Sequence, residues 1–177
     1  GIRMKLFPEN PILVFRPFHL NPRNYIYLAD RGRFYGDVRL YDDEGTGIHF
    51  YTNREDTIAE QEMTVELSRI DLKQFKKVLP YLPDVEGWLG RSAHYVDSEG
   101  QMMLSADVSL ENFVYEKSPL GNWAMNGVYL PGDNNAHHVD GFITHNDQEI
   151  IYMNGIYQAD ETGKENITGE LELQHFP

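Results

Sequence analysis

The sequence contains no cysteine and no long apolar run, and each absence excludes a class of structure. Without cysteine the chain forms no disulfide and has no thiol for catalysis or for zinc binding. No uninterrupted apolar stretch approaches the roughly 18 residues that a membrane-spanning helix needs. The first residues, "GIRMKLFPENP", also lack the apolar segment of a signal peptide.

Positive charge is scarce, since 15 Lys and Arg stand against 28 Asp and Glu, for a formal net charge of −13. The acidic residues are spread along the chain and form no acidic tail. A nucleic-acid-binding face needs clustered Lys and Arg, and so does adsorption to anionic lipid headgroups. We therefore expect no nucleic acid as a partner and no electrostatic adsorption to a membrane, whereas apolar contact with lipid stays open.

The length of 177 residues fits one domain, and we treat 1–177 as a single unit. Residue 1 is Gly rather than Met, and the sequence ends inside the alternating stretch "LELQHFP". We therefore expect the chain to be a fragment of a longer protein.

Turn-forming segments divide the chain into alternating stretches. Gly and Asn supply positive φ angles in turns, and Asp caps its own turn. Between the turns, apolar and polar residues alternate with period two, and Tyr, Ile, Val and Phe are common, which is typical of β-strands. This arrangement predicts an antiparallel meander of strands. The turn segments are "DDEGTG" (42 to 47), "DSEG" (97 to 100), "PGDNN" (131 to 135), "HND" (145 to 147) and "DETGK" (160 to 164).

One segment departs from the period of two. In "DLKQFKKVLPYLP", Leu72, Phe75 and Leu79 recur at helical spacing. Asp71 can cap the first turn, and Pro80 ends the run. The pattern predicts a short amphipathic helix near 71 to 79, which would either close one end of a sheet or form a lip on an apolar opening.

Three hexapeptides share the order apolar, polar, apolar, polar, polar, apolar: "VELSRI" (65 to 70), "VSLENF" (108 to 113) and "LELQHF" (171 to 176). A strand that alternates and then skips one residue turns its later side chains to the other face, unless a bulge absorbs the extra residue. We predict such bulges at Ser68-Arg69, Glu111-Asn112 and Gln174-His175. The spacing between the copies is irregular, so the repeat is not a fixed-period solenoid, and chance recurrence is the competing explanation.

No motif in the sequence indicates catalysis. There is no Gly-x-Ser-x-Gly elbow, no phosphate-binding loop and no dinucleotide fingerprint. His137, His138 and His145 fit no standard spacing of metal ligands, and His137 and His138 would point to opposite faces of a strand. We predict a protein without catalytic residues, metal or cofactor, which binds or scaffolds.

Four stretches carry a resemblance to a known family. In their order along the chain they resemble the TamB and AsmA-like proteins of the bacterial envelope, specifically the large Bacteroidota-type TamB chains. The likeness covers residues 12 to 177 and lies in the alternation, the glycines and the turns. The stretches are "RIDLKQFKKVLPYLPDVEGWLG" (69 to 90), "DVSLENFVYEKSPLGNWAMNGVYL" (107 to 130), "HHVDGFITHNDQEIIYMNGIYQ" (137 to 158) and "ITGELELQHFP" (167 to 177).

The resemblance implies an all-β fold whose long, twisted antiparallel strands form an open half-pipe, a β-taco-like apolar groove. It implies a periplasmic segment of a parent chain that is anchored in the inner membrane. The implied function is non-catalytic: the groove holds or conducts phospholipid acyl chains between the inner and outer membranes and supports outer-membrane biogenesis. The implied protein partner is an outer-membrane barrel assembly protein.

The apolar residues of the alternating stretches are the candidates for lining such a groove, because a strand's apolar face can bury acyl chains at about 25 cal/mol per Å². Two alternatives stay open. In one, the chain is a soluble β-sandwich module with a closed core, which binds carbohydrate or protein through Trp88, Trp123 and the tyrosines. In the other, it is a structural segment that pairs edge to edge with neighbouring strands. The groove candidates are Val65, Leu67, Leu104, Ala106, Val108, Leu110, Trp123, Met125, Ile151, Met153, Leu171 and Leu173.

Overall fold

The structure is a computed structural model and describes most of the chain. The described residues form β-strands joined by turns, together with a short 3-10 helix at Asp30–Gly32. No helix within the described part of the chain combines the length and the apolar character that a membrane span needs. The described residues are 1–8, 10–13, 16–53, 61–74, 80–81, 83–98, 100–132, 136–159 and 165–174.

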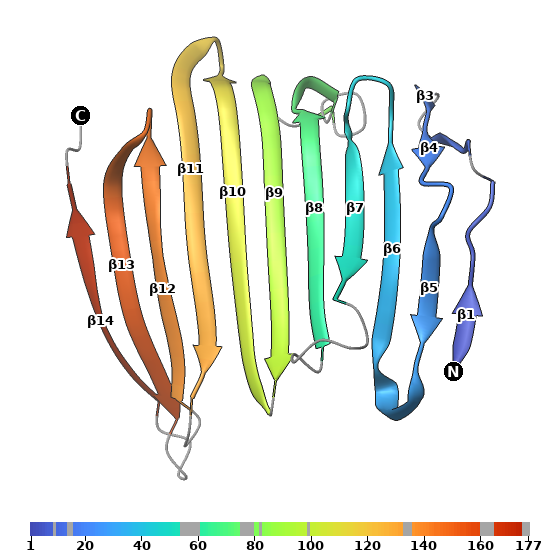
Figure 1. Cartoon of the computed structure of the whole chain (residues 1–177). Helices are drawn as coiled ribbons and strands as arrows, with labels where there is room; N and C mark the ends of the chain where they lie inside the picture. Colours follow the sequence, from blue (N-terminus) through green and yellow to red (C-terminus); the bar gives the residue numbers. More distant parts are fainter. Residues whose placement is uncertain are drawn as a thin grey trace.

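The strands form one open antiparallel sheet in which neighbours in sequence are neighbours in space (Figure 1). Twelve strands belong to it in the order β1-β5-β6-β7-β8-β9-β10-β11-β12-β13-β14, with β4 also paired to β6, while β2 and β3 form a separate pair. The predicted all-β meander is confirmed. The strands are β1 (Ile2–Met4), β2 (Ile12–Leu13), β3 (Arg16–Pro17), β4 (His19–Leu20), β5 (Tyr25–Leu28), β6 (Phe34–Tyr41), β7 (Gly47–Thr52), β8 (Gln61–Asp71), β9 (Val85–Ser98), β10 (Gln101–Tyr115), β11 (Ser118–Pro131), β12 (Ala136–His145), β13 (Gln148–Ala159) and β14 (Glu165–Leu173).

All five predicted turns fall between consecutive antiparallel strands, although residues 99, 133–135 and 160–164 lie outside the described residues. Asn146 and Asp147 form a two-residue hairpin turn with φ angles of 48° and 65°. Glu116 and Lys117 form a second turn of this kind, which the sequence analysis did not predict. Two successive positive φ angles match the right-handed twist of the flanking strands, which is why this turn joins long hairpins.

Two of the three predicted bulges are confirmed. Between Leu67 and Ile70 the register of β8 against β9 shifts by one residue, and Arg69 has a φ of 50°. The register of β10 shifts between Leu110 and Phe113 against β11, and Asn112 has a φ of 51°. The third predicted bulge includes position 175, which lies outside the described residues.

The bulges keep apolar side chains on one face of the sheet. Ile70 pairs with Leu89, which also pairs with Leu110, so the three residues share a face. Without the bulge in β8, strict alternation would place Ile70 on the other face. The irregular step in the repeated hexapeptide is therefore what preserves the apolar face at this end of the sheet.

Asparagine side chains satisfy backbone groups at the β10 bulge. The N–H of Asn112 donates to Oδ1 of Asn122 at 2.8 Å, and the N–H of Asn122 donates to Oδ1 of Asn146 at 2.9 Å. A bulged residue leaves the regular pairing of the sheet, so its N–H needs another acceptor. The β12–β13 turn and the β10 bulge are thus linked through Asn122.

The helix predicted near 71 to 79 is not confirmed. Strand β8 extends to Asp71, and the N–H of Lys73 donates to Oδ1 of Asp71 at 3.0 Å, which is the contact expected of a capping residue. Residues 75–79, the greater part of the predicted helix, lie outside the described residues.

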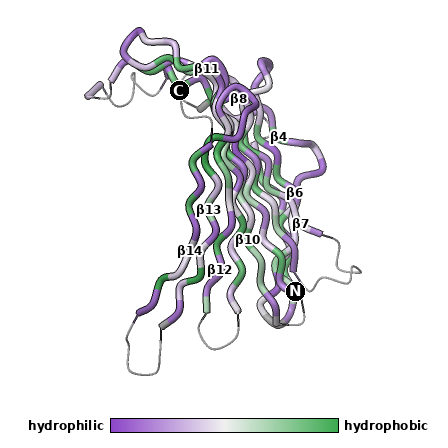
Figure 2. The backbone as a smooth tube through the Cα atoms, turned by 90° about the vertical axis from the view of Figure 1, so that its left-hand side faces the viewer, coloured by the Kyte–Doolittle hydropathy of each residue, from purple (hydrophilic) through white to green (hydrophobic). Residues whose placement is uncertain are grey.

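The sheet is one layer thick, and Figure 2 shows its strands following one another in that layer from the β14 edge. The solvent-accessible surface is 12,418 Å², whereas a compact monomer of this mass exposes about 8,900 Å². Among the described residues no large side chain is fully buried, and Tyr35 and Ile150 are the buried apolar ones. The described strands therefore form a sheet without the second layer that a sandwich would place against it.

The positive φ of Asn112 predicts how the β10 bulge responds to substitution. Replacing Asn112 with Val should lower the free energy of unfolding by about 1–2 kcal/mol, because a β-branched residue is strained at this φ, whereas Asn112→Gly should not. The midpoint of urea denaturation measures the change. Asn166→Val in β14, where φ is not positive, is the matched control, and an equal loss at both positions would contradict the bulge.

Candidate functional site

Alternation along the strands divides the sheet into two unlike faces. Residues that pair across neighbouring strands lie on the same face, so the register defines rows that cross the sheet. We call the face that carries Val65 the apolar face, and the face that carries Asp37, Glu66 and Asp140 the polar face. Figure 2 shows the alternation of hydrophobic and hydrophilic residues along β13 and β14.

Three rows make up the centre of the apolar face, and each follows the strand pairing from β6 or β7 to β14. The upper row, nearest the bulges, is Leu40, Ile48, Leu67, Arg91, Val108, Met125, Ile143, Ile151 and Leu173. The middle row is Val38, Phe50, Val65, Ala93, Ala106, Gly127, Gly141, Met153 and Leu171. The lower row is Thr52, Met63, Tyr95, Leu104, Tyr129, Val139, Gly155 and Gly169.

All twelve predicted groove residues lie on the apolar face. Ten of them belong to the three rows, and Leu110 and Trp123 pair with each other one step beyond the upper row. The first and third hexapeptides also align across the sheet, because Val65 and Leu171 share the middle row. The structure thus brings together residues that are up to about a hundred positions apart in the chain. That these residues contact lipid stays a prediction.

Much of the apolar face is exposed. Leu104 is 42% exposed, Met125 is 44% exposed and Leu171 is 65% exposed. Scattered exposed apolar residues are normal on a soluble protein, but a contiguous patch over several strands marks a surface that is covered in the functional state. The rows of the apolar face form such a patch.

A hollow of about 440 Å³ lies on the apolar face beside the β10 bulge, and its lining is entirely apolar. Its volume falls within the range of small-molecule pockets. Phe113, Leu120 and Ile143 belong to it but were not predicted, although Phe113 ends the second hexapeptide and so carried a signal. The lining residues are Val108, Leu110, Phe113, Leu120, Trp123, Ala124, Met125 and Ile143.

The indole of Trp123 presents only apolar surface to this hollow. Its Nε1 donates to the backbone oxygen of Leu120 at 2.8 Å, and Nε2 of His145 donates to the same oxygen at 2.9 Å. The rings of Trp123 and His145 lie 4.6 Å apart. Since the indole N–H is already paired, the ring can pack against an apolar ligand at no cost in hydrogen bonding.

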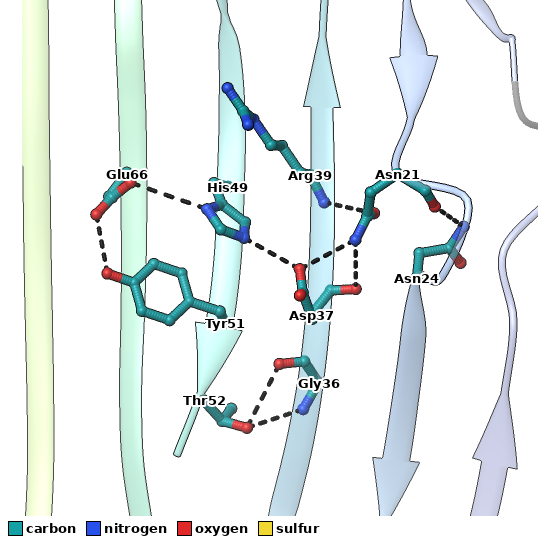
Figure 3. A network of polar contacts seen from close by, with 9 residues as sticks. All are labelled: Asn21, Asn24, Gly36, Asp37, Arg39, His49, Tyr51, Thr52 and Glu66. Carbon is teal, nitrogen blue, oxygen red and sulfur yellow. Dashed lines mark hydrogen bonds and ion pairs between the residues drawn. The ribbon is translucent and has the colours of Figure 1, made fainter. Parts of the chain in front are cut away.

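Hydrogen bonds between neighbouring side chains cover the polar face (Figure 3). Nε2 of His49 donates to Oδ1 of Asp37 at 3.0 Å, and Asn21 Nδ2 donates to the same oxygen at 3.0 Å. The hydroxyl of Tyr51 donates to Oε1 of Glu66 at 2.9 Å, and this bond, together with desolvation, raises the pKa of Tyr51. Many polar side chains of this face are thus hydrogen-bonded to one another, and the face stays exposed to solvent.

Asp140 forms a second polar cluster farther along the same face. Asn154 Nδ2 donates to Oδ2 of Asp140 at 3.0 Å, and the hydroxyl of Tyr152 donates to it at 2.8 Å. Because both bonds favour the ionised carboxylate, they lower the pKa of Asp140, and the bond to Asp140 raises the pKa of Tyr152.

The histidines do not gather into one site. Pairing places His137 on the apolar face and His138 on the polar face, as strand alternation predicted. The Nδ1 of His137 and the hydroxyl of Tyr129 are hydrogen-bonded at 2.6 Å. No group of three or more His, Asp or Glu suited to a metal ion is found in the part of the chain that the structure describes.

Comparisons of the chain with protein-family models, with curated proteins and with solved structures find no match. The likeness to TamB and AsmA-like proteins thus rests on the sequence patterns alone.

The cluster around Asp140 predicts a change in its titration. Asn154→Ala should raise the pKa of Asp140, because it removes the hydrogen bond that contributes most to lowering it. In the native protein the stabilising effect of this depressed pKa is present above the unfolded-state value of about 3.9 and is lost as the pH falls through the folded value. The carboxyl carbon shift of Asp140, followed against pH by NMR, measures the pKa. Asn166→Ala is the control, and identical titration curves in all three proteins would contradict the assignment.

Proposed function

We propose that the chain binds phospholipid acyl chains on its apolar face, as a non-catalytic segment of a TamB or AsmA-like envelope protein. The observation that supports this best is a single-layer sheet whose apolar face continues from β6 to β14 with no covering layer among the described residues. A β-sheet with an apolar face needs a second layer for stability. Acyl chains can supply that layer.

The size of the apolar face suits this ligand. The seven strands from β8 to β14 span six inter-strand distances, about 29 Å. The hydrocarbon core of a bilayer is about 30 Å thick, so one acyl chain reaches about 15 Å and covers about half of a row. Removing a Leu or Val side chain from water stabilises a complex by about 1.5–3 kcal/mol, so a few contacts per chain give useful affinity.

The remaining parts of the proposal rest on the resemblance. We infer that the twist of the sheet makes the apolar face the inside of an open half-pipe. The parent chain would be anchored in the inner membrane and located in the periplasm, and an outer-membrane barrel assembly protein would be its partner. In this arrangement the acidic polar face lies outward in water, which the chain's net charge of −13 favours.

Crosslinking distinguishes the two faces directly. Photoreactive residues placed at Leu104 and Leu110 should crosslink to phospholipid when the protein is expressed in a bacterial envelope, because both positions lie on the apolar face. Mass spectrometry of the adducts identifies the lipid. Ser105 and Ser109 are the matched controls, since they lie on the same strand and point to the polar face. Adducts with protein alone at Leu104 and Leu110 would contradict the proposal.

A charge placed on the apolar face should reduce lipid binding. Met125→Asp should lower the amount of phospholipid that co-purifies by about tenfold or more, because acyl chains would have to desolvate a carboxylate. Ser105→Asp places the same charge on the polar face of the neighbouring strand β10, outside the apolar hollow, and should leave the lipid content unchanged. Lipid extraction followed by mass spectrometry measures both. Equal lipid content in the two variants would contradict binding on the apolar face.

One observation favours a second candidate function, carbohydrate binding on the polar face. A hollow of about 400 Å³ is lined largely by residues of that face, including Glu66, Asp107 and Asn126, whose polar groups can bond sugar hydroxyls. Trp88 and Trp123 lie on opposite faces and so do not form one stacking platform. Binding on a glycan array that is lost in Asp107→Ala, together with a lipid-free protein, would favour this function over the first.

A further inference from the structure

Arg91 stands in the middle of the apolar face. It pairs across the sheet with Leu67 on β8 and Val108 on β10, and its neighbours on the same face of β9 are Leu89 and Ala93. It is the only charged residue in the three central rows. The sequence analysis placed no function on it.

The guanidinium of Arg91 has no partner among the described residues. Within the described residues it makes no hydrogen bond, ion pair or cation-π contact, and its side chain is exposed. Arg39 and Arg69, by contrast, each lie over an aromatic ring, at 4.9 Å and 5.3 Å from its centre. The chain has 28 acidic residues, yet Arg91 is surrounded by apolar side chains and pairs with no described carboxylate.

The position of Arg91 limits what can cover the apolar face. A purely hydrocarbon layer over the upper row would desolvate an unpaired guanidinium, which is strongly unfavourable. A ligand that brings an anionic oxygen to this point instead gains charge-assisted hydrogen bonds in a setting of low polarity. The occupant of the face therefore needs both apolar chains and an anionic group.

We propose that Arg91 binds the phosphodiester of a phospholipid whose acyl chains lie on the apolar face, an inference that rests on the function proposed above. The planar guanidinium fork matches two oxygens of a phosphate. Apolar residues lie on both sides of Arg91 along its row, so a headgroup held there has surface for two chains. The hollow beside Val108 offers one of those chains a place next to the headgroup.

A second copy of the chain fits this site less well than a phospholipid does. The three central rows contain no Asp or Glu, so an apolar face packed against its own copy would bring no carboxylate to Arg91. It would bring a second Arg91 into the same apolar layer, and like charges there repel each other.

The experiment compares two lipids that differ only in the headgroup. Dioleoylphosphatidylethanolamine and dioleoylglycerol are both without net charge, so the net charge of −13 on the chain does not bias the comparison. Each is offered to the 177-residue protein from neutral detergent micelles, and native mass spectrometry measures the bound fraction against lipid concentration. We expect the phospholipid to bind about tenfold or more tightly, the effect of one charge-assisted contact.

Variants of Arg91 separate a headgroup contact from a structural one. Arg91→Gln should abolish the preference for the phospholipid and leave the binding of dioleoylglycerol unchanged, and Arg91→Lys should restore part of the preference. Arg39→Gln, which removes the same charge from the polar face, should keep the full preference. A structural role of Arg91 would instead reduce the binding of both lipids together.

Several outcomes would overturn the inference. Equal binding of the two lipids by the native protein, or an undiminished preference in Arg91→Gln, would show that Arg91 does not bind the phosphodiester, while acyl-chain binding itself survives. Oleate that binds as tightly as the phospholipid, with the same loss in Arg91→Gln, would assign the site to a carboxylate. Failure of both lipids to bind, or a lipid-free dimer closed over the apolar face, would refute the proposed function itself.

Discussion

The structure depends on one constraint: an apolar face of a β-sheet has to be covered. A strand meander of this length buries almost no side chain within its own layer, because the two faces of a single sheet both meet solvent. Backbone pairing holds the strands together, but the stabilisation from apolar burial is left for whatever lies on the apolar face. The described strands leave the apolar face uncovered, and the proposed function is to cover that face with lipid.

The polar face explains how such a sheet can remain in water. Its carboxylates accept hydrogen bonds from neighbouring side chains, as Asp37 does from His49 and Asn21, and Asp140 does from Asn154 and Tyr152. These contacts cross from strand to strand and support the register. The central rows of the apolar face consist mostly of apolar residues, and Arg91, the one charged residue in them, has no partner among the described residues. The two faces thus differ in chemistry along the same strands.

The two confirmed bulges maintain this division between an apolar and a polar face. Arg69 and Asn112 each have a positive φ and lie in a bulge. Each bulge accommodates one extra residue, so that the later side chains of its strand stay on the same face. Asn122 accepts the N–H of Asn112 and links that bulge to the next turn through Asn146. The repeated hexapeptide is explained at its first two copies as a way to end an alternating strand without exposing apolar side chains on the polar face.

The sequence by itself determined the meander, the positions of five of its turns, two bulges and which of the groove candidates share a face, because the period of two and the turn residues act over a few neighbouring positions. Val65, Leu110 and Leu171 were assigned to one surface on that basis. The sequence did not determine which residues meet across the strands. Only long-range pairing sets Arg91 beside Val108 and gathers Phe113, Leu120 and Ile143 around one hollow, since register is fixed by the packing of whole strands against one another.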